Sequence, residues 1–252
     1  PSLVGSEMCI RDSILSNLLH LMFHRIVLYS PRELAYIWSV NKRKVSIAYN
    51  TLALEGRERL VRSTKEDLKR KFGFQEKFLV LFCGRIERRK RLDALVYLFT
   101  DRFKERKDLG LIIVGPNLPD ELREPVETSS NIHYLGPVYE SKACAEIFSS
   151  ADCFCIPGHL GLGIVEAFFW GLPVLTMTEE HAPEAYYLNP GENSLICKNA
   201  RELGNAIERL AEDPNLLRRL SEKARETYLK EARLERMISG FLEALRALEE
   251  KS

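Results

Sequence analysis

The residues best suited to chemistry lie at positions 151–176, in the run ADCFCIPGHLGLGIVEAFFWGLPVLT. The pattern predicts a strand, a turn spaced by Gly161 and Gly163, a short apolar helix and a second strand. A helix that begins at such a turn presents unpaired N–H groups and the positive end of its dipole, which favour an anion. Glu166 lies in this apolar helix, and its carboxylate can accept hydrogen bonds from hydroxyl groups of the same ligand. We therefore expect a phosphate at the turn and a sugar or ribose at Glu166.

A second candidate segment, GRIERRKR at residues 84–91, follows an apolar run that predicts a strand. Its cations lie at the start of a predicted helix, where the dipole disfavours each positive charge by about 0.3–1 kcal/mol. A bound anion would reverse that sign, and Arg and Lys side chains suit a diphosphate. A solvated basic run and a nucleic-acid patch are the alternatives. The net charge of +1, from 37 basic and 36 acidic residues, supports neither nucleic acid nor an anionic membrane as a partner.

Two further kinds of site fit the sequence poorly. The spacing G-x-G-x-x-E at residues 161–166 is similar to a dinucleotide fingerprint, but Glu166 replaces its third small residue and four residues separate the strand from Gly161. The six cysteines include Cys153 and Cys155 on one face of a predicted strand. Because no second Cys or His pair follows at metal-ligand spacing, we expect buried free thiols and no metal site.

Strands and helices alternate from about residue 77 onward, which predicts an α/β fold with a Rossmann-like, doubly wound parallel sheet. The strands are short continuous apolar runs, as expected when both faces of a sheet are covered. Ligands of such sheets bind beyond the carboxyl ends of the strands, where the loops at 84–90, 115–117 and 157–163 fall. The strands are predicted at 78–83, 110–114, 132–135, 153–156, 173–176 and 195–197, and the helices at 91–107, 119–128, 141–150 and 161–171.

The composition predicts several segments around this core. We interpret residues 1–13 as a non-native leader, because they lack an initiator Met and resemble translated adapter sequence. Residues 14–54 are predicted to form a small unit that contains a strand, a helix at 31–40 with a capping box, and a second strand. The polar residues 55–76 that follow are predicted to form a linker. The sheet domain then covers 77–199. Helices predicted within 200–252 carry apolar residues at helical spacing, namely Met237, Phe241, Leu245 and Leu248, which we expect to pack on that domain.

Three motifs together carry a family resemblance. GRIERRK at residues 84–90 resembles the G-R-x-x-x-x-K segment of nucleotide-sugar glycosyltransferases of GT-B fold, family 4. The run SSADCFCIPGHLGLGIVEAFFWGLPVLT, followed by HAPEAYYLNPGENSLI, resembles the second half of the same family, and AYNTL resembles its inter-domain hinge. The likeness extends from about Tyr29 to the C-terminus. It implies that the chain is the C-terminal, donor-binding half of a GT-B enzyme, with residues 14–54 as a truncated remnant of the acceptor domain.

The resemblance also implies a reaction and its partners. Such an enzyme is a retaining hexosyltransferase that moves a hexosyl unit from a UDP- or GDP-sugar to a hydroxyl of a sugar or lipid-linked sugar acceptor. It implies no metal and no other cofactor, because cationic side chains replace the metal. We expect a cytoplasmic protein, with peripheral membrane contact allowed through the missing domain. We also expect residues 14–252 to bind nucleotide weakly and to lack transferase activity alone.

Residue roles follow from the same resemblance. Arg85 and Lys90 match the positions that hold the donor diphosphate and stabilise the charge of the leaving nucleotide. Glu166 matches the second glutamate of an E-x7-E motif and would bind the nucleotide ribose. The remaining donor-binding candidates are the first residue of the basic motif, the backbone of the glycine turn, the base-binding edge and two residues near the donor sugar: Gly84, Gly161, Leu162, Gly163, Ile164, Val138, His159 and Glu184.

The sequence departs from the family pattern at Gly158, where the first glutamate of E-x7-E is absent. His159 is either its substitute or a plain loop histidine. Glu184 is either an acid near the donor sugar or a favourable acid at a helix N-terminus. These departures leave a non-catalytic nucleotide- or phosphate-binding module of the same fold as an alternative function, and a polyanion-binding protein as another.

Overall fold

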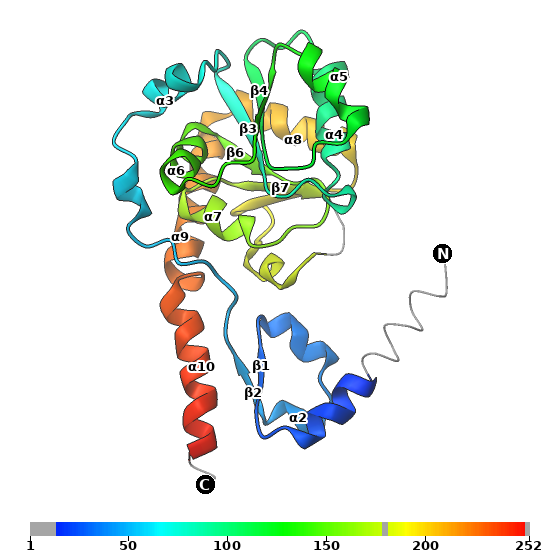
Figure 1. Ribbon diagram of the computed structural model, residues 1–252, viewed down its shortest axis with the longest axis vertical. Coiled ribbons are helices and arrows are strands. Elements are labelled where there is room, and N and C mark those ends of the chain that lie inside the picture. The colour runs from blue at the N-terminus through cyan, green and yellow to red at the C-terminus, as the bar shows by residue number, and fades with distance from the viewer. Residues whose placement is uncertain (1–13, 178–180, 250–252) are drawn as a thin grey trace.

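The computed structural model describes residues 14–177 and 181–249, so the expected leader at 1–13 lies outside the described residues. The chain forms a larger lobe built on a sheet and a smaller lobe below it in the view of Figure 1. In the smaller lobe, β1 (Ile26–Leu28) pairs in parallel with β2 (Val45–Ile47). The larger lobe contains the predicted doubly wound parallel sheet of six strands.

All six strands predicted for the larger lobe are present, with small shifts at their ends. Each is parallel to its neighbours, in the order β5-β4-β3-β6-β7-β8. They are β3 (Phe78–Cys83), β4 (Leu109–Val114), β5 (Ile132–Gly136), β6 (Cys153–Cys155), β7 (Val174–Met177) and β8 (Ser194–Cys197).

The strand order reverses between β3 and β6. From β3 the chain builds outward through β4 to β5 at one edge, and it then returns to the other side of β3 with β6, β7 and β8. Val80 of β3 pairs with Cys153 of β6, and Leu81 pairs with Phe154. A reversal of this kind leaves a crevice beyond the carboxyl ends of the two strands. The loops that follow β3 and β6 therefore flank the place where a ligand is expected.

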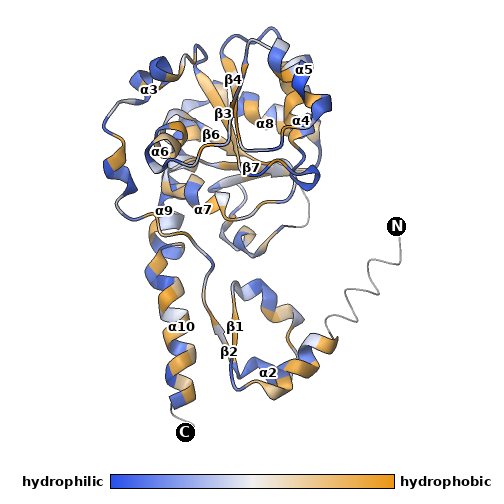
Figure 2. Cartoon of the chain, viewed as in Figure 1, coloured by the Kyte–Doolittle hydropathy of each residue, from blue (hydrophilic) through white to orange (hydrophobic). Residues whose placement is uncertain are grey.

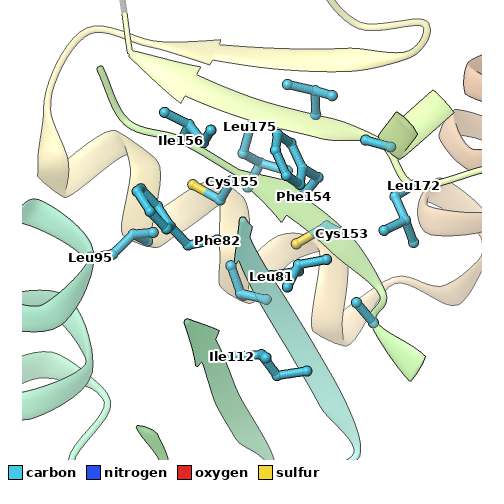
Figure 3. Packing of buried hydrophobic residues seen from close by; sticks show 14 of the residues in the cluster. Leu81, Phe82, Leu95, Ile112, Cys153, Phe154, Cys155, Ile156, Leu172 and Leu175 are labelled. Atoms are coloured by element: carbon cyan, nitrogen blue, oxygen red, sulfur yellow. The ribbon is translucent and has the colours of Figure 1, made fainter. Parts of the chain in front are cut away.

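Continuous apolar runs explain why these strands lie at the centre of the fold. Leu79, Leu81 and Phe82 of β3 are 0% exposed, and the same is true of Cys153 and Cys155 of β6. Figure 3 shows the β3 and β6 side chains packed together, and Figure 2 shows the sheet strands as mostly apolar. Both cysteines are free thiols, as predicted.

Helices cover both faces of the sheet. They are α4 (Leu92–Tyr97), α5 (Asp120–Thr128), α6 (Ser141–Ser150), α7 (Gly163–Phe169), α8 (Ala200–Glu212) and α9 (Pro214–Glu231). The helix predicted at 91–107 is shorter, because α4 passes into a π-helical turn, η4 (Leu98–Arg102), and ends before Phe103. Residues 104–107 are all charged, so no apolar side chain holds another turn against the sheet.

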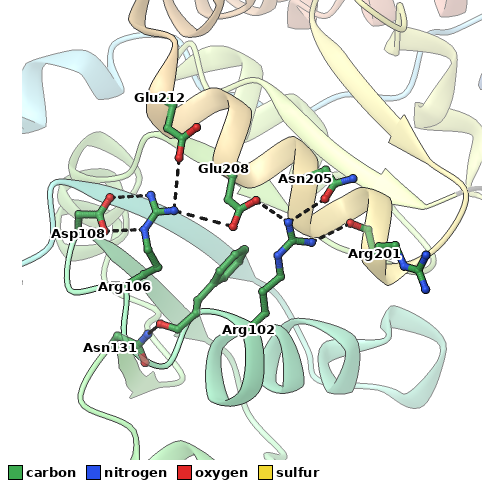
Figure 4. Close-up of polar contacts among 9 residues, drawn as sticks. Arg102, Arg106, Asp108, Asn131, Arg201, Asn205, Glu208 and Glu212 are labelled. Atoms are coloured by element: carbon green, nitrogen blue, oxygen red, sulfur yellow. Dashed lines mark hydrogen bonds and ion pairs between the residues drawn. The ribbon is translucent and has the colours of Figure 1, made fainter.

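An ion-pair network fastens η4 and the following turn to α8 (Figure 4). Arg102 contacts Glu208 at 2.5 Å, and Arg106 contacts Glu212 at 3.4 Å. Gly204 allows this approach, because a Cβ there would lie 2.6 Å from Arg102 Nη1. The network lies on α8 rather than in the loops after β3 and β6, and we assign it a structural role.

Two connections join the lobes. Residues after β2 run upward to η2, a 3₁₀ helix (Arg57–Leu60), and α3 (Lys65–Phe72), while the chain returns through the junction of α9 and α10 (Leu234–Glu249). The two connections are bonded to each other, since Thr51 Oγ1 donates to Ala232 O. Asp152, at the start of β6, pairs with Lys65 at 2.5 Å and so attaches α3 to the larger lobe.

The last helix corrects one expectation. α10 does not pack on the larger lobe but on β1 and β2 of the smaller one. Its contact face is built from Gly240 and Ala244, because a Cβ on Gly240 would lie less than 3.0 Å from the Ile47 carbonyl oxygen. Phe241 and Leu245, predicted as core-facing, are 39% and 56% exposed. The apolar spacing was right for a helix but did not show which face is covered.

The helix predicted at 31–40 is also divided. It forms a 3₁₀ helix, η1 (Pro31–Tyr36), and a short α2 (Ser39–Lys42). The predicted capping role of Glu33 is present, since its carboxylate accepts from the backbone N–H of Ser30 at 2.8 Å. Ile37 interrupts the helix with an extended backbone, and its side chain is buried between β1 and the small-lobe helices.

Candidate functional site

The loops after β3 and β6 are joined by backbone hydrogen bonds. Gly158 N donates to Lys90 O at 3.0 Å, and His159 N donates to Arg89 O at 2.7 Å. A Cβ at position 158 would lie less than 3.0 Å from the Arg89 carbonyl oxygen, a separation that real Cβ atoms essentially never show. Position 158 therefore requires glycine in this arrangement. The absent first glutamate has a physical reason, because the pairing of the two loops leaves no room for it.

Lys90 lies over the carboxyl end of β3. An ideal Cβ on Gly84 would lie 2.5 Å from Lys90 Nζ, and Gly84 adopts a φ of +138° that disfavours other residues. Within residues 14–177 and 181–249, the ammonium has neither an ion-pair nor a hydrogen-bond partner. Burial lowers the pKa of Lys90, the charges of Arg89 and Arg85 lower it further, and Glu87 partly offsets them. The loop thus presents a partly desolvated cation that an anion would stabilise.

The other cations of this loop are more exposed. Arg85 and Arg88 are both exposed, and Arg89 forms an ion pair with Glu87 at 2.7 Å. Arg85 lies close enough to Lys90 to affect its pKa. The structure therefore places the two predicted diphosphate-binding residues, Arg85 and Lys90, together at the end of β3.

Glu166 lies on α7, the helix that follows β6. Arg57 Nη1 contacts its Oε1 at 3.0 Å, and Cys144 Sγ donates to the same oxygen at 3.8 Å. Burial raises the pKa of Glu166, while Arg57 and Cys144 act in the opposite direction. In the described part of the chain, Oε2 has no partner. One carboxylate oxygen is thus held by the protein and the other remains available to a hydroxyl donor.

Cys83, the last residue of β3, connects the two halves of the site. The nearby Cys144 thiol and burial raise the pKa of Cys83. A Cβ on Gly163, at the start of α7, would lie 3.8 Å from Cys83 O, and Lys90 Nζ lies over the adjoining Gly84. The basic loop and the start of the helix that carries Glu166 therefore approach the same end of β3, at the reversal of strand order.

The glycine turn is slightly different from the one predicted. The helix begins at Gly163 rather than Gly161, and Ile164 N donates to Gly161 O at 3.1 Å. The N–H groups of Gly161, Leu162 and Gly163 have no hydrogen-bond acceptor among the residues that the structure describes. Three of the four predicted backbone donors are thus free, and that of Ile164 is used within the turn.

The remaining predicted residues lie on three other segments. Val138 is half-buried in the loop between β5 and α6, and α6 carries Cys144. His159 follows Gly158 in the loop that contacts the basic segment. Glu184 is 5% exposed on the 3₁₀ helix η5 (Pro183–Tyr187) and accepts a hydrogen bond from Asn50 Nδ2. Its contact is therefore with the connection between the lobes.

Sequence reasoning missed two residues of the site, Arg57 and Cys144. Arg57 lies 109 positions before Glu166 in a polar segment, and nothing in its spacing distinguishes it from its neighbours. Within residues 14–177 and 181–249, no group of three or more His, Cys, Asp or Glu side chains is arranged to hold a metal ion. In the same residues, no helix is long and apolar enough to cross a membrane.

Sequence comparisons identify relatives. The family described as glycosyl transferases group 1 matches residues 64–227. An uncharacterized glycosyltransferase of Methanocaldococcus jannaschii is 26% identical over 204 residues, which are 76% of this chain and 50% of that protein. An uncharacterized 41.2 kDa protein from the cps region of Klebsiella pneumoniae is 29% identical over 150 residues, 58% of this chain and 39% of that protein. The chain thus spans half or less of the length of these curated relatives.

Solved structures share the fold. A glycosyltransferase from Rickettsia africae matches with a TM-score of 0.77 and 16% identity, over 94% of this chain and 67% of that one. HepE from Anabaena in complex with UDP matches with a TM-score of 0.76 and 18% identity, over 94% of this chain and 68% of that one. Sucrose-phosphate synthase from Thermosynechococcus elongatus matches with a TM-score of 0.70 and 22% identity, over 90% and 58%. At these identities the likeness establishes the architecture.

Proposed function

The chain belongs to the glycosyl transferases group 1 family and has the GT-B fold, and on this premise we propose that it binds the sugar donor of a retaining hexosyltransferase. The donor would be a UDP- or GDP-hexose, and the acceptor a hydroxyl of a sugar or lipid-linked sugar. HepE has been solved with UDP-glucose, which supports a donor of this class. The observation that carries the proposal is geometric: Gly163, at the start of the helix that carries Glu166, lies against Cys83 O, and Lys90 lies over the adjoining Gly84, where the strand order reverses.

The geometry suits a nucleoside diphosphate in three ways. The unpaired ammonium of Lys90 and the exposed guanidinium of Arg85 offer charge-assisted hydrogen bonds to a diphosphate. The free N–H groups of the turn at 161–163 offer further donors to phosphate oxygens. Glu166 Oε2 offers an acceptor to a ribose hydroxyl. Val138, in the loop after β5, would border the base.

The same groups supply the catalytic contribution that we propose. When the bond between the hexosyl carbon and the diphosphate breaks, negative charge develops on the leaving nucleotide. Lys90 lies over Gly84 at the end of β3 before the reaction and would stabilise that charge together with the exposed Arg85. In this proposal no metal takes part, because these cations neutralise the diphosphate. His159 would lie nearest the donor sugar, since it follows the loop contact made by Gly158.

A thermal-shift screen tests the proposal. UDP, GDP, ADP and their hexose derivatives are added to the wild type, to Arg85→Ala and to Glu166→Ala. At a ligand concentration about 100 times Kd, one nucleotide should raise the Tm of the wild type by about 5 °C or more. The two variants should respond less, and Arg123→Ala, a substitution on the exposed face of α5, should respond like the wild type. A screen in which no nucleotide stabilises the wild type more than Arg85→Ala and Glu166→Ala would refute the site.

One observation favours a second candidate, a non-catalytic nucleotide-binding module of the same fold. The contact between Gly158 and the Arg89 carbonyl leaves no room for a carboxylate at position 158, and the family resemblance places such a group there. Assays of hexosyl transfer test the second candidate in one direction. Transfer to any sugar acceptor that is abolished by Lys90→Ala excludes the module, whereas an absence of transfer by residues 14–252 is expected for both candidates.

A further inference from the structure

We propose that Arg57 is a positioning residue for the donor: it fixes Glu166 so that one oxygen of the carboxylate stays free for a ribose hydroxyl. The inference rests on the proposed function, because it places a nucleoside diphosphate at Glu166. Arg57 does not touch the ligand in this account. It acts through Glu166, from a segment that connects the two lobes.

The contacts at Glu166 explain the orientation of its carboxylate. Arg57 Nη1 lies 3.0 Å from Oε1, and Cys144 Sγ lies 3.8 Å from the same atom. Two donors on one oxygen fix the plane of the carboxylate and leave Oε2 unoccupied by any described residue. A carboxylate has capacity for several hydrogen bonds, so Oε2 can accept from a hydroxyl without giving up either contact.

Arg57 is itself held firmly, although it lies in a connecting segment. Leu54 is 0% exposed within the core of the larger lobe, and Arg57 N donates to Leu54 O at 3.0 Å. The carboxylate of Glu55 accepts from Tyr228 Oη at 3.0 Å, which attaches the same segment to α9. Gly56 makes the turn between them with a φ of +85°. These contacts fix the point from which the Arg57 side chain reaches Glu166.

The surroundings of Glu166 make such a partner necessary. The adjacent residues of α7, among them Val165 and Ala167, are fully buried, and the Glu166 side chain is only 14% exposed. A carboxylate in this setting is stabilised by a partner that is both charged and hydrogen-bonded. Arg57 is 33% exposed and supplies such a partner. Without it, Glu166 would lose part of its ionised population and one of the two contacts that orient it.

A structural role for the same ion pair is the competing explanation. If Arg57 only fastens the connecting segment to the larger lobe, its loss lowers the stability of the fold and lowers the affinity for every ligand by the same factor. If it positions Glu166, its loss removes the part of the affinity that depends on ribose hydroxyls and leaves the part that depends on the diphosphate. The two explanations therefore differ in how Arg57→Gln treats ligands with and without those hydroxyls.

The experiment is isothermal titration calorimetry with two probes, UDP and 2′,3′-dideoxy-UDP, on the full chain. The wild type should prefer UDP by about tenfold to a hundredfold, the worth of a hydrogen bond to a charged group. Glu166→Gln should lose most of that preference, and so should Arg57→Gln, while both keep their affinity for the dideoxy compound. Arg57→Lys should restore part of it. Arg59→Gln, an exposed arginine of the same 3₁₀ helix, is the matched control and should behave like the wild type.

The remaining outcomes are informative in different ways. An Arg57→Gln protein that retains the full preference, while Glu166→Gln loses it, overturns the inference and leaves the proposed function intact. Equal loss of both ligands in Arg57→Gln and in Arg57→Lys, with folded protein by circular dichroism, also overturns it in favour of a structural role. A wild type that binds neither UDP, GDP nor ADP refutes the proposed function, and the inference falls with it.

Discussion

Replacing Lys90 by Met should separate two contributions of this side chain, one to stability and one to anion binding. Met keeps much of the length of the side chain and removes its charge. In the structure the ammonium lies over Gly84 without a partner in the described residues, and burial, then Arg89 and Arg85, lower the pKa of Lys90. Charged Lys90 is therefore less favourable in the folded protein than in the unfolded chain.

The sign of the stability change follows from this pKa. Because the pKa is lower in the folded state, the unfolded chain binds the proton more tightly, and folding becomes more favourable as pH rises through the folded-state pKa. At neutral pH the charge thus opposes folding, and Lys90→Met should leave Tm unchanged or raise it. For ligand binding, the expected effect of Lys90→Met is unfavourable. A hydrogen bond to a charged group is worth about 1.5–3 kcal/mol, so UDP should bind about tenfold to a hundredfold more weakly.

Thermal unfolding by circular dichroism and calorimetric titration with UDP measure the two effects on the same preparation. Lys104→Met, at an exposed lysine beyond η4, is the control and should change neither quantity. Added salt should weaken UDP binding more steeply in the wild type than in Lys90→Met, because the variant has one cation fewer whose attraction to the diphosphate salt can screen. A large fall in Tm with undiminished UDP affinity would show that Lys90 serves the fold rather than the ligand, and would refute the reasoning.

Three further predictions concern other parts of the chain. Gly158→Ala should lower the free energy of unfolding by about 1–3 kcal/mol, because its Cβ would overlap the Arg89 carbonyl. Gly161→Ala should leave the free energy of unfolding unchanged, because a Cβ there has open space. Equal melting temperatures for the two variants would contradict the close approach at Gly158. Gly240→Ala should loosen α10 from β2, which limited proteolysis would detect as earlier cleavage near the C-terminus, and an unchanged digest counts against it. Because burial raises the pKa of Glu166 above its usual 4.5, UDP affinity should fall as pH drops from neutral toward 4.5. The affinity of Glu166→Gln should fall less, because only the terminal phosphate of UDP, with a pKa of about 6, then titrates. Parallel pH profiles would contradict an ionised Glu166 at the site.

The sheet could be predicted because its signal is local. Each strand is a short apolar run bounded by polar or turn residues, and LVLF at residues 79–82 becomes four fully buried positions of β3. The place of the site followed from the same pattern, since parallel strands bring their carboxyl ends to one edge. Lys90 and Glu166 are 76 positions apart (166 minus 90), and they follow the neighbouring strands β3 and β6; their common role at one site stays a prediction.

The parts that could not be predicted depend on contacts between distant segments. Periodicity showed that residues 234–249 form a helix, but the choice of Gly240 and Ala244 as its buried face depends on how closely α10 approaches β2. Likewise, nothing in the pattern of residues around Arg57 indicates that its side chain contacts Glu166, 109 positions later. The extent of η4 was missed for a related reason, because tertiary packing rather than helix propensity decides where a marginal helix ends.

The glycine at position 158 joins these observations into one arrangement. In the resemblance from sequence, the loop before Glu166 lacks the first glutamate of the E-x7-E motif at Gly158. In the structure, Gly158 N binds Lys90 O and His159 N binds Arg89 O, and this pairing is possible only without a side chain at 158. The loop therefore exchanges a carboxylate for a fixed position of the basic segment. Glu166 is held by a different part of the chain, because Arg57 of the connecting segment pairs with its carboxylate.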